Sequence, residues 1–135
     1  MELKEINMIE KLKELQNNAY AKYSDYPVST IVITNDGKEF NGVNVEDATT
    51  RAGSCAERVA LFSMIAAGYT KGDVKEINIM TKNGGTPCFV CRQMLIELCD
   101  MDTIINCYDI NGNLNTYTVK ELCPYPFNEE DLKWK

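Results

Sequence analysis

Two short cysteine motifs constrain the fold of this 135-residue chain more than any other feature. Cys55-Ala56-Glu57 and Pro87-Cys88-Phe89-Val90-Cys91 each open a segment with a helical pattern of apolar residues. Three thiolates can form a tetrahedral Zn²⁺ site with a fourth position left for water, as in a catalytic rather than a closed structural site. A fold that uses all three sulfurs must therefore direct the starts of two helices at one point.

The remaining cysteines have no suitable spacing for a fourth ligand. Cys99 lies about 12 Å from Cys91 along the same expected helix, at about 1.5 Å per residue. Cys107 falls in an expected strand and Cys123 in a short helix, so we interpret all three as small buried hydrophobic residues. The chain has no histidine, which excludes Ser-His-Asp and Cys-His nucleophile systems.

Glu57 is the candidate for moving protons. It stands two residues after Cys55, a separation that would place it on the opposite face of a regular helix. At the first turn Cys55 need not have helical dihedrals, so Glu57 can swing across a metal-bound water. Three thiolates on Zn²⁺ leave a negative charge, which the two helix N-termini and the cation Arg58 would offset. We expect Arg58 to donate to the ligand sulfurs.

Apolar periodicity and turn residues predict one domain over residues 1–135. Strands are expected at 28–34, 40–45, 74–80, 103–108 and 114–118, and helices at about 2–22, 55–68 and 88–98, with a short last helix capped by Thr118 and Glu121. Pro87 suits the first turn of its helix, and Gly68 is the expected helix stop. Strands that alternate with helices around one mixed sheet indicate an α/β fold, a three-layer α/β/α sandwich.

Charge and hydropathy limit the class of partner. The net charge of −6 opposes binding to a long phosphate backbone, so we expect no nucleic-acid partner. No segment approaches the roughly 20 apolar residues that span a bilayer, and the N-terminus lacks the apolar stretch of a signal peptide. We therefore expect a cytoplasmic protein that binds a small molecule and no membrane.

Six stretches of the chain together resemble the small homotetrameric cytidine deaminases. They are Ala19–Ser24, Asn44–Glu46, Cys55–Arg58, Pro87–Gln93, Glu121–Leu122 and Pro126–Phe127. Cys-Ala-Glu followed by Pro-Cys-x-x-Cys is the signature of the zinc deaminases, in which the glutamate is not a metal ligand. The resemblance implies a five-stranded mixed sheet flanked by helices and one Zn²⁺ per chain, held by Cys55, Cys88 and Cys91, with Glu57 as the catalytic residue.

The resemblance also implies substrate-binding residues. Asn44 and Glu46 match positions that hold the ribose hydroxyls, and the backbone at Ala56 matches the part that reads the pyrimidine. Tyr26 stands where the family usually has Phe, which retains a ring against the substrate. Phe127 matches an aromatic residue that closes the site of a neighbouring subunit, so a homotetramer with shared active sites is expected.

Two stretches depart from the family pattern. Ser29-Thr30-Ile31 replaces a Gly-Ala-Ala run, and Thr50-Arg51 stands where an aromatic residue would begin the approach to the metal loop. These changes imply an altered pocket shape and unaltered metal chemistry. Thr50, being smaller than the expected aromatic residue, should leave extra room near the sugar.

The leading expectation is hydrolytic deamination of cytidine and deoxycytidine to uridine and deoxyuridine, with release of ammonia, as in pyrimidine salvage. A deaminase of an aminonucleoside antibiotic such as blasticidin S is the enzymatic alternative, although Arg58 and Glu46 favour the nucleoside. Two further hypotheses are a non-catalytic, zinc-stabilised binding module and a thioredoxin-type redox pair at Cys88 and Cys91.

Overall fold

Five strands form one mixed sheet in a computed structural model that describes residues 2–133. The strands are β1 (Ser29–Thr34), β2 (Glu39–Val43), β3 (Val74–Met80), β4 (Ile104–Tyr108) and β5 (Leu114–Thr118), in the spatial order β2-β1-β3-β4-β5. β3 and β4 run parallel, and every other neighbouring pair is antiparallel. The expected five-stranded mixed sheet is therefore confirmed.

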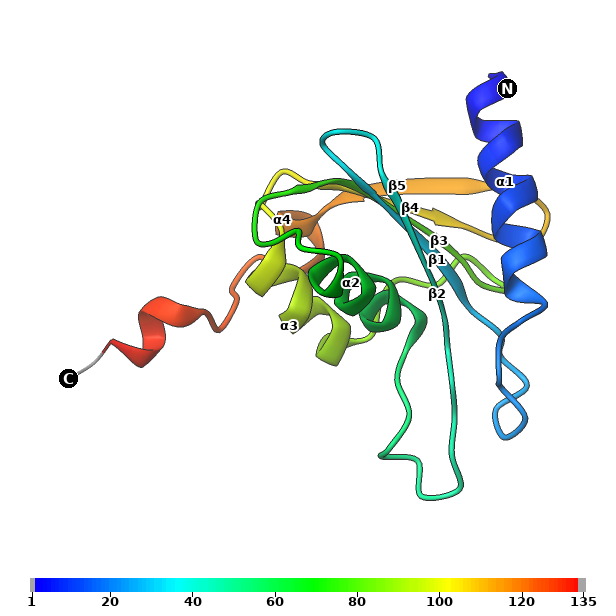
Figure 1. Ribbon diagram of the computed structural model, residues 1–135, viewed down its shortest axis with the longest axis horizontal. Coiled ribbons are helices and arrows are strands. Elements are labelled where there is room, and N and C mark those ends of the chain that lie inside the picture. Colours follow the sequence, from blue (N-terminus) through cyan, green and yellow to red (C-terminus); the bar gives the residue numbers. More distant parts are fainter. Residues whose placement is uncertain (1, 134–135) are drawn as a thin grey trace.

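Helices cover both faces of the sheet (Figure 1). α1 (Leu3–Gln16) packs on one face, whereas α2 (Ala56–Ala66) and α3 (Phe89–Leu98) lie side by side on the other. A short helix, α4 (Val119–Leu122), and a 3-10 turn (Glu129–Leu132) follow β5. This arrangement confirms the three-layer α/β/α sandwich.

The central strands are apolar on both sides because each contributes to two cores. Successive side chains of a strand point to opposite faces, so Ile31 of β1 packs with α1 while its neighbour Val32 packs with α2 and α3. Tyr108 and Cys107 of β4 divide in the same way. The β-branched run of β1 is thus explained by burial on two faces.

The first helix is shorter than its apolar pattern predicts. It ends at Gln16 rather than near residue 22, and Asn17 and Asn18, which are weak helix formers, follow it. Beyond them Tyr20 pairs with Val45, which itself lies outside β2 instead of extending it. This long-range pairing competes with the helix for the backbone of Tyr20.

Several local predictions are confirmed. Gly68 follows the end of α2 with φ of +98°, and Thr118 and Glu121 form both hydrogen bonds of a capping box on α4. Pro87 is an exception, since α3 begins at Phe89 with Cys88 as its N-cap and the proline lies before the cap. Within residues 2–133, no helix has the length and apolarity needed to cross a membrane.

Gly42 of β2 sets the position of α2. A Cβ atom at this residue would lie 2.2 Å from the carbonyl oxygen of Ala56 and 2.5 Å from the backbone nitrogen of Ala60. No side chain larger than hydrogen fits such a gap, so glycine lets the start of α2 lie directly on the strand. The start of α2 carries the first cysteine motif.

Candidate active site

The three motif cysteines converge at the starts of α2 and α3. Their sulfur atoms all lie within 4.8 Å of one another, and the Sγ atoms of Cys55 and Cys88 are 3.8 Å apart. Cys55 and Cys88 are the N-cap residues of the two helices, and Cys91 lies in the first turn of α3. Cys55 has extended dihedrals (φ −71°, ψ 154°), as the approach of Glu57 to the same site requires.

The electrostatics of the three sulfurs fit a bound cation. The neighbouring Cys91 thiol, together with Arg58 and Cys88, lowers the pKa of Cys55 to about 5. The proximity of Cys55, together with burial, raises the pKa of Cys91. Without a cation the sulfurs cannot all ionise together, because each new thiolate would repel the first. Three sulfur ligands with a fourth position free are a donor set suited to one Zn²⁺.

Glu57 is a buried carboxyl group beside this cluster. Its residue is 5% exposed, and its Oε1 atom is buried without a hydrogen-bond partner. Burial raises the pKa of Glu57 to about 7, which suits a group that takes up and returns a proton near neutral pH. A buried, unpaired carboxyl oxygen is costly and indicates a group retained for function.

Arg58 places a positive charge next to the sulfurs. Its Nη2 atom is 3.7 Å from the Sγ atom of Cys55, and this contact raises the pKa of the guanidinium. The Nε atom of Arg58 is buried without a partner. The guanidinium of Arg58 is therefore held by its contact with Cys55, and its positive charge offsets part of the negative charge of three thiolates.

A pocket of about 430 Å³ opens beside Cys55 and Arg58. It runs from these two residues to Glu46, and its volume is in the range of pockets for small organic ligands. Its lining residues are Tyr23, Ser24, Asn44, Val45, Glu46, Asp47, Thr50, Gly53, Ser54, Cys55 and Arg58. The pocket thus joins one of the three sulfurs to both residues expected to hold the sugar.

Asn44 holds the segment that precedes β1. Its side-chain oxygen accepts a hydrogen bond from the Val28 backbone nitrogen, and its amide nitrogen donates to the Tyr26 carbonyl, both at 2.9 Å. Sequence reasoning assigned Asn44 to the sugar alone and missed this contact. No local pattern signals it, because the partners lie 16 and 18 residues away.

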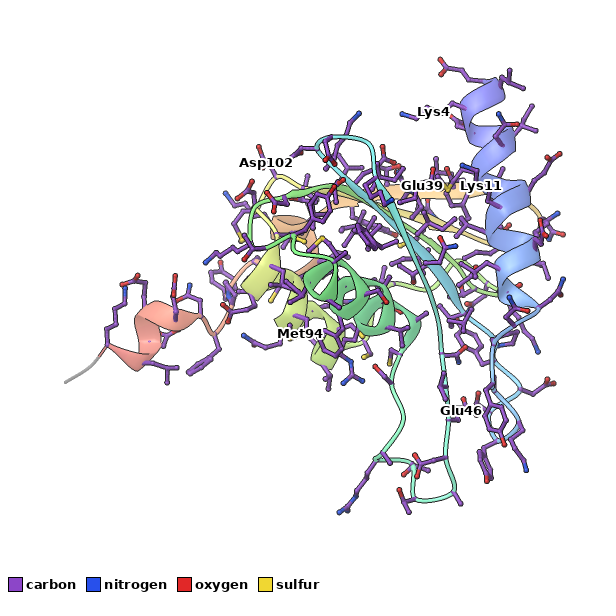
Figure 2. All side chains as sticks on the ribbon, in the orientation of Figure 1. Lys4, Lys11, Glu39, Glu46, Met94 and Asp102 are labelled. Atoms are coloured by element: carbon purple, nitrogen blue, oxygen red, sulfur yellow. The ribbon has the colours of Figure 1, made fainter. Side chains whose placement is uncertain are left out.

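Glu46 holds the same segment at a second point. Its Oε1 atom accepts hydrogen bonds from the backbone nitrogens of Tyr23 and Ser24, each at 3.0 Å, and the Ser24 hydroxyl donates to Oε2. These bonds keep the pKa of Glu46 below its usual value, with the Ser24 side chain the largest cause. Figure 2 shows Glu46 on the long segment after β2, next to the loop that follows α1. The carboxylate is therefore charged and fixed in position at the wall of the pocket.

The remaining expected substrate residues occupy different surroundings. Ala56 is fully buried as the first residue of α2. The Tyr26 hydroxyl donates to the side-chain oxygen of Asn83 at 2.7 Å. Phe127 is 57% exposed and does not line the pocket, and Gln93 donates to its carbonyl at 2.7 Å.

The two departures from the family pattern differ in their relation to the pocket. Thr50 lines it and has a positive φ of 62°. Ser29-Thr30-Ile31 is buried within β1, and neither it nor Arg51 lines the pocket. The expected change of pocket shape is thus restricted to Thr50.

The cysteines outside the cluster are free thiols. Cys99 and Cys107 are buried, and burial raises the pKa of each thiol to about 12. Their interpretation as small core residues is confirmed. Cys123 is only half-buried, so the same interpretation is wrong for it, because α4 ends at Leu122 and leaves the next residue partly open to solvent.

A mixed sheet between helix layers, with three sulfurs and a buried glutamate at two helix starts, defines the class of zinc-dependent hydrolytic deaminases. Residues 3–107 match the family model described as the cytidine and deoxycytidylate deaminase zinc-binding region. The chain belongs to this family and is a zinc-binding deaminase.

Relatives and solved structures agree with this assignment. The chain is 35% identical over 127 residues to a cytidine deaminase of Halalkalibacterium halodurans, which covers 93% of this chain and 95% of the relative. A cytidine deaminase of Mycoplasma genitalium is 33% identical over 85% of this chain and 88% of its own. The crystal structure of cytidine deaminase from Burkholderia pseudomallei superposes with a TM-score of 0.86 at 37% identity, covering 94% of this chain and 100% of that one.

Proposed function

We propose that this enzyme deaminates cytidine and deoxycytidine hydrolytically to uridine and deoxyuridine, releasing ammonia as a cytoplasmic step of pyrimidine salvage. The observation that carries the proposal is the unpaired carboxyl group of Glu57 beside three convergent sulfurs. The pocket that starts at Cys55 ends at a fixed carboxylate, Glu46, which can accept hydrogen bonds from sugar hydroxyls. The cytidine deaminases among the relatives support the same substrate class.

In this proposal Cys55, Cys88 and Cys91 hold one zinc ion per chain. The ion supplies Lewis acidity that makes water a usable nucleophile near neutral pH. Glu57 accepts a proton from the attacking water and delivers it to the ring nitrogen next to the carbon that bears the amino group. It then takes the remaining proton from the hydroxyl group that water has added to that carbon and passes it to the amino group, so that the C–N bond breaks, ammonia leaves and the carbonyl of the uracil ring forms. Arg58 offsets the charge of the sulfurs throughout.

The pocket residues orient the nucleoside. Asn44 and Glu46 do not use all of their hydrogen-bonding groups on the 23–28 segment. Asn44 retains one N–H, both residues retain lone pairs, and these groups bind the ribose hydroxyls. The backbone at Ala56 contacts the pyrimidine, and the ring of Tyr26 packs against it. Thr50 leaves room for a bulkier sugar.

We further propose that residues 1–135 are one deaminase domain that works as a homotetramer. Phe127 is exposed on a C-terminal arm that projects from the sheet and its helices (Figure 1). The outer faces of α2 and α3 carry further exposed apolar side chains: Phe62, Ile65, Phe89 and Val90. An apolar face of this kind suits burial against another copy, and Phe127 would then reach a neighbour's pocket. Light scattering should report a tetramer, and a monomer with full activity would contradict this.

The experiment that tests the function is an assay of ammonia release from cytidine, deoxycytidine and blasticidin S by the zinc-loaded protein. We expect turnover of both nucleosides. Glu57→Gln should retain one zinc per chain and lose nearly all turnover, because an amide cannot accept the proton. Turnover of blasticidin S alone would replace the nucleoside with the antibiotic, and no turnover of any substrate would favour a zinc-stabilised binding module. Full activity of Glu57→Gln would remove Glu57 from the mechanism.

A further inference from the structure

A hairpin between β2 and α2 brings the two ends of the pocket together. Val45 and Ser54 exchange both of their backbone hydrogen bonds, at 3.0 and 2.9 Å. In an antiparallel pair the flanking residues face each other, so Asn44 lies opposite Cys55 and Glu46 lies opposite Gly53. This one pairing therefore sets a metal-site cysteine against the residues at the sugar end.

Gly53 makes the pairing tight. A Cβ atom on Gly53 would lie 2.0 Å from the carbonyl oxygen of Val45 and 3.2 Å from the Cα atom of Glu46. The two strands of the hairpin thus approach as closely as backbones can. Any side chain on Gly53 would push the two strands apart.

Asp47 closes this turn with its side chain. Its Oδ1 atom accepts hydrogen bonds from the backbone nitrogens of Ala52 and Gly53, each at 3.0 Å. Its Oδ2 atom accepts from the Thr49 backbone nitrogen at 2.9 Å and from the Thr49 hydroxyl. Oδ1 therefore joins the two sides of the turn, and Oδ2 fixes the start of the turn on the side of Asp47.

The turn needs this support because its tip is strained. Thr50 lines the pocket with a φ of 62°, a conformation that β-branched residues rarely adopt. Such a conformation persists only when surrounding contacts impose it. The Asp47 carboxylate accepts hydrogen bonds from residues on both sides of Thr50: from Thr49 before it, and from Ala52 and Gly53 after it.

We propose that Asp47 is a positioning residue for the deamination, which fixes the distance between Cys55 at the metal end of the pocket and Asn44 and Glu46 at the sugar end. This inference rests on the proposed function and adds to it a residue of the pocket wall whose carboxylate oxygens bond within the hairpin itself. Loss of the Asp47 carboxylate should leave the sulfurs in place and loosen the sugar end.

The chain offers a matched control in Asp109, at the turn between β4 and β5. Its Oδ1 atom accepts from the backbone nitrogens of Asn111 and Asn113 at 2.9 and 3.0 Å, and Oδ2 accepts from the Asn113 side chain at 2.9 Å. Asp109 thus makes the same kind of bonds as Asp47 and does not line the pocket. A general loss of stability should therefore be similar in the two alanine variants.

The test compares Asp47→Ala, Asp47→Asn and Asp109→Ala in the zinc-loaded protein. We expect all three to keep one zinc per chain, and Asp47→Ala to raise KM for cytidine about tenfold with a smaller change in kcat. Asp47→Asn should recover part of this loss, because its amide oxygen still accepts hydrogen bonds. Free cytosine, which has no sugar, should respond little. An equal rise of KM in Asp109→Ala, or an unchanged KM in Asp47→Ala, would overturn the proposal.

Hydrogen exchange separates this inference from the proposed function. Asp47→Ala should speed exchange of the Val45 and Ser54 amides at least about tenfold, and Asp109→Ala should not. If the wild-type protein deaminates no nucleoside, the proposed function fails, and the exchange rates still measure whether Asp47 holds the hairpin. Unchanged exchange in both Asp47 variants would refute the role of Asp47 whatever the substrate.

Discussion

Gly42→Ala should strongly lower the activity of the enzyme, although Gly42 itself does not line the pocket. The new methyl group would lie 2.2 Å from the Ala56 carbonyl oxygen and 2.5 Å from the Ala60 nitrogen. Ordinary van der Waals contact begins near 3.4 Å, so the start of α2 must move away from β2 by about 1 Å. Ala56 lies between Cys55 and Glu57, and both must move with it.

The expected losses of stability and of catalytic rate follow from this displacement. Overpacking of a core contact costs about 1 to 3 kcal/mol of unfolding free energy. A misplacement of about 1 Å in a catalytic group can lower the rate about a hundredfold. We therefore expect a lower Tm and a much lower kcat, measured by calorimetry and by ammonia release under saturating cytidine.

Gly37→Ala is the control for this experiment. Gly37 has φ of +88°, and no atom lies within 4 Å of the position that a methyl group would take, so alanine strains only the turn between β1 and β2. It should cost about 1 kcal/mol of stability and leave kcat within about twofold. If Gly42→Ala had the kcat and Tm of the wild type, the close approach of α2 to β2 would not position the catalytic residues.

Three further predictions concern the metal and two tyrosines. Cys88→Ala should lose zinc, measured by metal analysis, and unfold at a lower temperature, because thiolate ligation is coupled to folding. Tyr26→Phe should cost about 0.5 kcal/mol in denaturant unfolding, because it removes the hydrogen bond from the Tyr26 hydroxyl to Asn83. The Tyr69 hydroxyl donates to Asp36, which raises the pKa of Tyr69. The stability advantage over Tyr69→Phe should therefore be full below about pH 10 and vanish as pH rises through the higher folded pKa; an advantage that persists there would contradict this.

Local patterns predicted most of the fold. The expected β5 matches the observed strand, and the capping box of α4 and the glycine after α2 depend only on neighbouring residues. The convergence of the cysteines also followed from their places at two helix starts.

Contacts between distant segments could not be predicted in this way. α1 ends early because Tyr20 pairs with Val45, and no periodicity within residues 2–22 contains that information. The hydrogen bonds of Asn44 and Glu46 to the 23–28 segment were missed for the same reason. Asp47 was passed over because a single acidic residue in a polar loop has no distinguishing pattern until the turn around it is known.

Because the N-cap residues of α2 and α3 are also zinc ligands, the stability of the folded chain should depend on the concentration of free zinc. Cys55 and Cys88 occupy the N-cap positions, and neither side chain makes the usual capping hydrogen bond. Zinc on these sulfurs would hold the two helix starts together. Because the three sulfurs come together only in the folded chain, bound zinc would add to the free energy of unfolding. The gain is about 1.4 kcal/mol for each tenfold rise of free zinc above the dissociation constant. At low zinc, the first turns of these two helices are where the chain should begin to open.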